Sequence, residues 1–179
     1  GYKAGLLSTV RNIIHKSVYE AKQTTPDSLS LNQLLHQMVE EGCEYAFMEV
    51  SSHACVQHRI DGIKFAGGIF SNLTRDHLDY HLTVDNYIAA KKRFFDLLPA
   101  DAFALVNADD KNGTVMLQNT AARRLTYSLR TVADYKTKIL ETRLNGTTLD
   151  INGKEVNVLF TGRFNAYNLT SVYGAAVEL

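Results

Sequence analysis

Three short apolar runs constrain the fold of this chain more than any other feature of its sequence. They cover residues 45–50 (YAFMEV), 65–73 (FAGGIFSNL) and 102–110 (AFALVNADD). Apolar runs of this length, bounded by polar residues, are typical of strands that are buried on both faces of a parallel sheet. Segments with helical spacing precede or separate them. This alternation predicts βαβ units and a mainly parallel sheet flanked by helices, which is an α/β fold.

The expected helices lie in residues 30–42 and 83–98. The first places leucines, Met38 and Val39 at helical spacing, and Gly42 is a natural stop. In the second, Thr83 is expected to cap the amino end. We further expect a short strand over residues 6–10 and a weaker helix that reaches about Thr120. A last helix should begin within residues 164–168.

The pattern changes after about residue 137. Residues 138–160 contain alternating stretches broken by Asn145-Gly146 and Asn152-Gly153. Asn-Gly is a strong signal for a two-residue hairpin turn. The sequence therefore predicts three antiparallel strands, a small sheet appended to the parallel one at about 137–161.

Composition narrows the classes of function. The 179 residues suit one domain or slightly more, and the 19 basic and 19 acidic residues cancel, which argues against a non-specific nucleic-acid binder. We find no apolar run of the roughly 20 residues that a membrane helix needs. Cys43 and Cys55 form no CxxC pair, so we expect small core residues in a reducing cytoplasmic setting.

Ionisable residues gather where two of the expected strands end. Residues 49–81 hold four of the six histidines. Ligands of open α/β sheets bind at the carboxyl ends of the strands. We therefore expect the functional site in this stretch, which contains Glu49, His53, His58, Asp76, His77, Asp79 and His81.

The residues alone leave several interpretations open. Glu49 ends an apolar run, where a carboxylate is costly unless it holds Mg²⁺ or pairs with Arg or Lys. His77 and His81 have a spacing that could bind zinc, or they are polar loop residues. Spacing places Lys91 on the apolar face of its helix, with Lys92 and Arg93 pointing more toward solvent, and this favours a snorkelling lysine. Arg59 could bind a carboxylate or phosphate, or simply be exposed.

Three segments, in this order and spacing, closely resemble the central domain of the Mur ligases. They are MEVSSHACVQHR, SNLTRDHLDYH and YIAAKKRFF. The resemblance runs through essentially the whole chain. It implies a fold like that of the phosphate-loop NTPases, and an ATP-dependent ligase that uses Mg²⁺. Such a ligase adds a diamino acid, meso-diaminopimelate or L-lysine, to UDP-MurNAc-L-Ala-D-Glu through an acyl phosphate in peptidoglycan synthesis.

The resemblance also implies roles for particular residues. Glu49 and His77 would bind Mg²⁺, and Lys91 matches the lysine that the family carries as a carbamate, an anionic oxygen ligand. This reverses the preference that spacing alone gives for Lys91. Asn165 and Asn168 match the region near the adenine. The residues expected to hold the muramyl-dipeptide are Thr24, Thr25, Ser51, Gln57 and Arg59. For His53, His58 and His81 we expect packing and hydrogen bonding.

The chain departs from the family pattern in two places. The phosphate loop GxxxxGK[ST] does not occur in these residues, and NGKEV at 152–156 is expected to be a hairpin. Gln23 stands where many relatives have Asn. We expect a monomeric central-domain piece that lacks the phosphate loop and the N- and C-terminal domains and has no ligase activity alone.

Three other functions remain open at this point. The nearest is another ligase of the superfamily, such as folylpolyglutamate synthetase, although VQHR after EVSSH argues against it. A non-enzymatic module that binds a nucleotide sugar or a metal is the second. The third is a zinc hydrolase that uses His77, Asp79 and His81.

Overall fold

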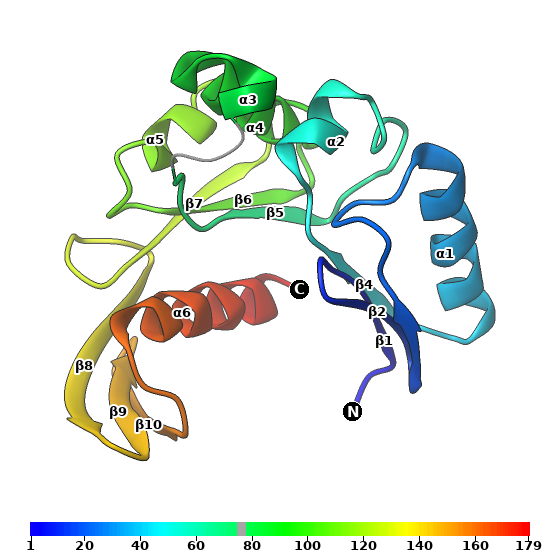
Figure 1. The fold of residues 1–179 in the computed structure, drawn as a ribbon. Coiled ribbons are helices and arrows are strands. Elements are labelled where there is room, and N and C mark those ends of the chain that lie inside the picture. The colour runs from blue at the N-terminus through cyan, green and yellow to red at the C-terminus, as the bar shows by residue number, and fades with distance from the viewer. Residues whose placement is uncertain (75–77) are drawn as a thin grey trace. The chain divides into compact units, whose positions relative to one another are not determined.

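The first unit of the fold is a four-stranded sheet with one long helix. A computed structural model describes residues 1–74 and 78–179 and divides the chain into two compact units, residues 1–63 and 64–179 (Figure 1). The first contains β1 (Ala4–Leu7), β2 (Arg11–Ile14), β3 (Ser17–Glu20), α1 (Ser28–Glu40), β4 (Tyr45–Met48) and α2 (Ser52–Val56). The strand order is β3-β2-β1-β4, and only β1 and β4 pair in parallel.

The predicted strand at 6–10 is shifted, and two strands that follow it were not predicted. β1 ends at Leu7, and the chain then turns, with the Ser8 hydroxyl donating to the Arg11 carbonyl at 2.7 Å. β2 and β3 have four residues each, too short to show a clear alternation of polar and apolar side chains. Their antiparallel pairing is therefore invisible in the sequence pattern.

Helix α1 confirms the predicted segment and its stop at Gly42. The Asp27 carboxylate caps the amino end by accepting from the Leu29 and Ser30 amides, and Gly42 has a φ of 73°. Leu31 and Met38 are buried. The helix lies close to β1, because a Cβ on Gly5 would lie 2.2 Å from the Met38 sulfur.

The second unit is built on a six-stranded sheet. Its order is β10-β9-β8-β7-β6-β5, with parallel pairing from β5 to β8 and antiparallel pairing from β8 to β10. The strands are β5 (Gly67–Phe70), β6 (Phe103–Asn107), β7 (Arg123–Ser128), β8 (Tyr135–Arg143), β9 (Gly146–Ile151) and β10 (Lys154–Val158). The helices are α3 (Leu78–His81), α4 (Val84–Asp96), α5 (Gly113–Met116) and α6 (Arg163–Glu178). This confirms the predicted α/β class, its mainly parallel sheet and its antiparallel extension.

Helices cover both faces of this sheet (Figure 1). On one face, Phe95 of α4 and Met116 of α5 pack with Phe70, Ala104 and Val106. On the other, Ala175 of α6 packs with a second buried cluster that contains Phe103, Leu105, Tyr127 and Tyr135. All five residues of β6 are buried, as the run at 102–110 predicts. Among the described residues, no helix has the length and apolar character that crossing a bilayer requires.

One predicted strand is less buried than its apolar run suggests. Residues 45–48 form β4 as expected, but β4 is an edge strand of the first sheet, and Phe47 is 46% exposed. The apolar run therefore predicts the strand correctly and its full burial wrongly. β7 was not predicted, because Arg123 and Arg124 break the apolar pattern at its start.

Candidate functional site

The parallel strands of the first unit bring Glu49 and Thr9 together. β1 and β4 run side by side, with Leu7 opposite Met48, so the residues that follow both strands meet at one edge. Glu49 Oε2 accepts from the Thr9 hydroxyl at 2.5 Å and from the Thr9 amide at 3.3 Å. Thr9 Oγ1 also lies 3.1 Å from Thr24 Oγ1.

This arrangement corrects the sequence argument about Glu49. Its side chain is exposed, so burial does not force the carboxylate to find a partner. None of the ion pairs in the described part of the chain involves Glu49, and a threonine orients it instead. Thr9 was missed in the sequence, and the only signal for it was its place just after a strand. Carboxylate and hydroxyl oxygens are the donors that hard cations such as Mg²⁺ take.

Thr25 and Ser51 form a second, more buried contact beside Glu49. The Thr25 side chain is 1% exposed, and its hydroxyl donates to the Glu49 carbonyl at 2.8 Å. The Ser51 amide donates to Thr25 Oγ1 at 3.0 Å, and the two hydroxyl oxygens lie 3.4 Å apart. Ser51 also caps α2 by accepting from the Ala54 amide at 3.1 Å. The loop that carries Thr25 is therefore tied to the end of β4.

Arg59 is held by neutral acceptors. Its guanidinium donates to Gln57 Oε1 from Nε at 2.9 Å and from Nη2 at 2.5 Å. Nη1 donates to Gln23 Oε1 at 2.5 Å and to the Thr25 carbonyl at 2.8 Å. Within the described residues no carboxylate pairs with Arg59. A fixed guanidinium whose charge is not neutralised suits a carboxylate or phosphate ligand.

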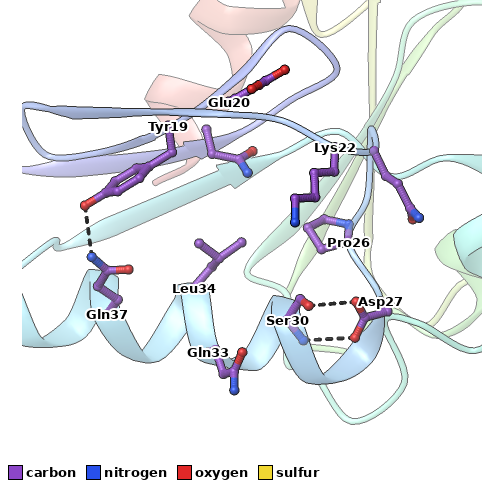
Figure 2. A pocket seen from close by; sticks show the side chains of 11 residues that line it. Tyr19, Glu20, Lys22, Pro26, Asp27, Ser30, Gln33, Leu34 and Gln37 are labelled. Carbon is purple, nitrogen blue, oxygen red and sulfur yellow. Dashed lines mark hydrogen bonds between the residues drawn. The ribbon is translucent and has the colours of Figure 1, made fainter.

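The loop that carries Gln23 also lines a pocket of about 380 Å³. Figure 2 shows Lys22 pointing toward α1. Among the residues that line the pocket, Gln37 donates to the Tyr19 hydroxyl at 3.1 Å, and the Ser30 hydroxyl donates to the Asp27 carboxylate at 2.7 Å. Asn12 also lines the pocket; it is 6% exposed, and its Oδ1 is buried without a hydrogen-bond partner among the described residues. Gln23 belongs both to this pocket and to the contacts of Arg59.

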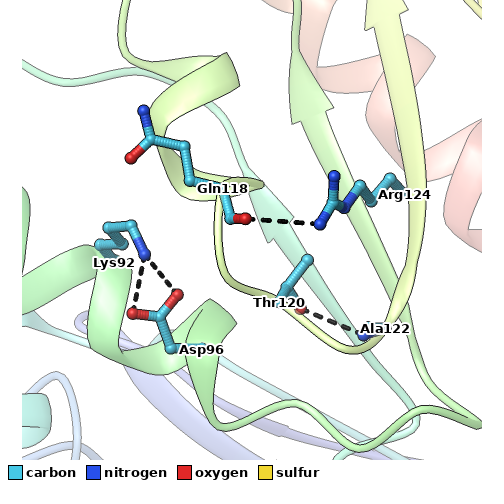
Figure 3. A network of polar contacts seen from close by, with 6 residues as sticks. All are labelled: Lys92, Asp96, Gln118, Thr120, Ala122 and Arg124. Carbon is cyan, nitrogen blue, oxygen red and sulfur yellow. Dashed lines mark hydrogen bonds and ion pairs between the residues drawn. The ribbon is translucent and has the colours of Figure 1, made fainter.

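In the second unit, Lys91 lies on helix α4, and Thr83 caps this helix as predicted. Lys91 Nζ lies 5.2 Å from the centroid of the Tyr87 ring, a distance typical of a cation–π contact. Lys92 is different, because its amine pairs with both oxygens of Asp96 at 2.6 and 2.8 Å (Figure 3). Its side chain is only 13% exposed, so the prediction that Lys92 points to solvent is wrong.

The same close-up shows how the chain leaves α5 for β7. Arg124 donates to the Gln118 carbonyl at 3.4 Å, and the Thr120 hydroxyl accepts from the Ala122 amide at 3.2 Å (Figure 3). These contacts fix the connection between α5 and β7.

His81 and His58 both contact neighbouring side chains. His81 is 5% exposed and stacks on Tyr87 with ring centroids 5.1 Å apart. His58 pairs with Asp61 at 2.7 Å on the surface. The predicted ligand His77 lies outside the described residues. Among those that are described, no three His, Cys, Asp or Glu side chains form a group that could hold a metal ion.

Asn165 and Asn168 lie one turn apart near the start of α6. Asn165 Nδ2 donates to the Thr161 carbonyl at 2.8 Å, and the Asn168 carbonyl accepts from the Ser171 hydroxyl at 2.8 Å. Between them, the Tyr167 hydroxyl donates to the Asp109 carboxylate at 2.8 Å. Asp109, at the end of β6, was not singled out in the sequence, although it lies in one of the three apolar runs.

The predicted residues thus fall into two groups. The first unit brings together Thr24, Thr25, Glu49, Ser51, Gln57 and Arg59, and the second contains Lys91, Asn165 and Asn168.

A comparison with known protein families shows which family the chain belongs to. Residues 2–176 match the model of the Mur ligase middle domain. The chain belongs to this family. It is 66% identical, over its whole length, to a UDP-N-acetylmuramoyl-L-alanyl-D-glutamate–2,6-diaminopimelate ligase of Parabacteroides distasonis. It is 64% identical to the protein of the same name from Phocaeicola vulgatus.

A solved structure agrees with the sequence relatives. A UDP-N-acetylmuramoyl-L-alanyl-D-glutamate–2,6-diaminopimelate ligase superposes with a TM-score of 0.85 at 32% identity, covering 99% of this chain and 38% of that one. The chain likewise spans 37% of the length of each of the two curated relatives. The shared part is the middle domain of a longer ligase in each case.

Proposed function

We propose that this middle domain works within an ATP-dependent ligase that adds meso-diaminopimelate to UDP-MurNAc-L-Ala-D-Glu. The observation that carries the proposal is the 66% identity, over all 179 residues, to a ligase of that name. A second relative of the same name at 64% identity supports diaminopimelate over L-lysine and over folate as the substrate class.

The reaction consists of two transfers. An oxygen of the D-glutamyl carboxylate attacks the γ-phosphorus of ATP, and the bond to the ADP oxygen breaks. The amine of the diamino acid then attacks the acyl carbon, loses a proton, and phosphate leaves as the amide forms. Both steps concentrate negative charge, so positioning and electrostatic stabilisation are the main tasks of the protein.

In the first unit, Arg59 is the group best suited to the substrate carboxylate. Its guanidinium is fixed by Gln57 and Gln23, which leave its positive charge uncompensated. Thr24, Thr25 and Ser51 present hydroxyl groups beside it and complete the proposed contact with the muramyl-dipeptide.

For the metal, the structure offers a partial donor set. Glu49 is exposed and oriented by Thr9, and its oxygens fit Mg²⁺. Mg²⁺ bound there would neutralise phosphate charge. Lys91 fits a cation site only after carbamylation, since its ammonium, now over the Tyr87 ring, would repel a metal ion. From the family resemblance we assign His77 to a second Mg²⁺, and Asn165 and Asn168 to the nucleotide.

An assay of the whole protein that contains this domain tests the proposal. Purified protein is incubated with ATP, Mg²⁺ and UDP-MurNAc-L-Ala-D-Glu, and with either meso-diaminopimelate or L-lysine. We expect a tripeptide product and stoichiometric phosphate with meso-diaminopimelate. Product with L-lysine alone would overturn the assignment of the amino acid, and no product with either would overturn the ligase.

A further inference from the structure

Asp109 accepts hydrogen bonds from two separate parts of the second unit. Its Oδ2 accepts from the Leu129 amide at 2.8 Å, the Arg130 amide at 2.9 Å and the Tyr167 hydroxyl at 2.8 Å. Its Oδ1 accepts from Thr131, from the amide at 3.0 Å and from the hydroxyl at 2.9 Å. One carboxylate thus joins the end of β6 to the loop after β7 and to helix α6.

These hydrogen bonds lower the pKa of Asp109 more than partial burial raises it. Burial by itself would raise the pKa of Asp109, but the Leu129 amide, the Tyr167 hydroxyl and both donors of Thr131 hold the pKa well below its ordinary value. The carboxylate is therefore ionised at neutral pH. Hydrogen bonds to an ionised acceptor are roughly twice as strong as neutral ones.

The Asp109 carboxylate, the Tyr167 hydroxyl and the loop at 129–131 form one hydrogen-bonded junction. Tyr167 links this junction to the residues proposed to contact the nucleotide. Tyr167 packs against the buried cluster of Phe103, Leu105 and Tyr127, so its ring is fixed by the core. Asn165 and Asn168, the proposed nucleotide contacts, lie on either side of it in α6. The bond to Asp109 consequently sets how the first turns of α6 lie against the end of β6.

We propose that Asp109 is a positioning residue for the nucleotide end of the site, acting through Tyr167 and the loop at 129–131. This inference rests on the proposed function. Asp109 itself is not proposed to contact the reacting atoms. It holds in one arrangement two segments that the nucleotide would otherwise have to order on binding, and such ordering lowers affinity.

The test uses the whole protein with Tyr167→Phe, which removes one hydroxyl and keeps the ring. The matched control is Tyr173→Phe on the same helix, where the ring packs edge-on against Tyr135 at 6.0 Å between centroids. We expect KM for ATP to rise roughly threefold to tenfold in Tyr167→Phe, which is less than the full loss of a charged hydrogen bond, because this bond acts on the nucleotide only through the position of α6. The kcat and the KM for the UDP-linked dipeptide should stay within about twofold of wild type, and so should all three constants of Tyr173→Phe. A purely structural role would lower the active fraction and leave the KM for ATP unchanged.

Hydrogen exchange examines the junction without any assay of activity. In Asp109→Asn, the amides of Leu129, Arg130 and Thr131 should exchange faster than in wild type, while the amides of β6 keep their protection. Unchanged exchange at the three amides overturns the junction. If the wild type is active and Tyr167→Phe has an unchanged KM for ATP, the proposed role of Asp109 is overturned and the proposed function is not. An inactive wild type overturns the proposed function itself.

Discussion

At the scale of single residues, two side chains that the sequence did not single out hold predicted site residues in place. Thr9 orients Glu49, and Asp109 joins the loop at 129–131 to α6. Neither belongs to a recognisable motif in the sequence. Each follows a strand end, where the direction of a side chain depends on the neighbouring strand or helix, and that neighbour is known only from the fold. The residues predicted within motifs, such as Thr25, Ser51 and Arg59, were found to contact one another or the same loop.

The role of Thr9 can be separated from its packing. Thr9→Val keeps the shape of the side chain but removes the hydroxyl that donates to Glu49 at 2.5 Å. We expect the ligase rate of the whole protein to fall about tenfold, and the Mg²⁺ concentration at half-maximal rate to rise, because a hydrogen bond to a charged group contributes about 1.5–3 kcal/mol. Thr9→Ser retains the donor and should remain close to wild type. Equal rates for the valine and serine variants would contradict the role.

The pH dependence of stability follows from the pKa of Asp109. The folded state lowers this pKa, so the unfolded chain binds the proton more tightly. The stabilisation is present above the ordinary aspartate pKa of about 3.9 and is lost as pH falls toward the folded value. Asp109→Asn should therefore lower the free energy of unfolding at pH 7, and the difference from wild type should shrink below about pH 4. Urea titrations from pH 7 to pH 3 measure it, and a difference independent of pH would refute the ionised junction.

At the scale of elements, the two Asn-Gly pairs show what a sequence signal can and cannot specify. Asn152 and Gly153 form a two-residue turn between Ile151 and Lys154, with φ of 49° and 81°, as the motif predicts. The turn between β8 and β9 instead uses Leu144 and Asn145, and Gly146 begins β9. Gly146 is needed for a different reason, because a Cβ there would lie 2.4 Å from the Val158 carbonyl oxygen. The two identical dipeptides therefore have different structural roles, and only the fold distinguishes these roles.

Substitution by asparagine distinguishes these two glycines. Asparagine adopts positive φ more readily than alanine, so Gly153→Asn should destabilise the protein less than Gly153→Ala. At Gly146 any Cβ meets backbone, so Ala and Asn should both lower the free energy of unfolding, by about 1–3 kcal/mol. Thermal and urea unfolding of the four variants provide the measurement. A Gly146→Ala variant as stable as wild type would contradict this expectation. It would mean that the backbone at Val158 moves away from the added Cβ without lowering the free energy of unfolding.

At the scale of the whole molecule, the fold class and most of the elements follow from the apolar runs, and the grouping of the site residues does not. The run at 102–110 predicts β6, and helical spacing predicts α1 and α4, because each of these segments buries apolar side chains of its own. Short strands such as β2 and β3 carry too few residues for any period, and tertiary pairing decides their structure. Of the residues predicted to be catalytic, Glu49 lies in the first unit and Lys91 in the second.

The motifs that residues 1–179 contain lead to a prediction for these residues expressed alone. They contain no GxxxxGK[ST] segment, whose backbone amides and lysine hold ATP phosphates in related folds, and they span 37% of the length of the ligases they resemble. The clusters of buried residues on both faces of the six-stranded sheet should nevertheless let the domain fold, with cooperative unfolding by circular dichroism. We expect no amide product from ATP, the UDP-linked dipeptide and meso-diaminopimelate, in contrast to the whole protein at equal concentration. Product from the folded domain alone would mean that the described residues hold ATP without that loop, and the phosphate contacts would then have to be sought among the first unit's own side chains, beginning with Arg59 and Lys22.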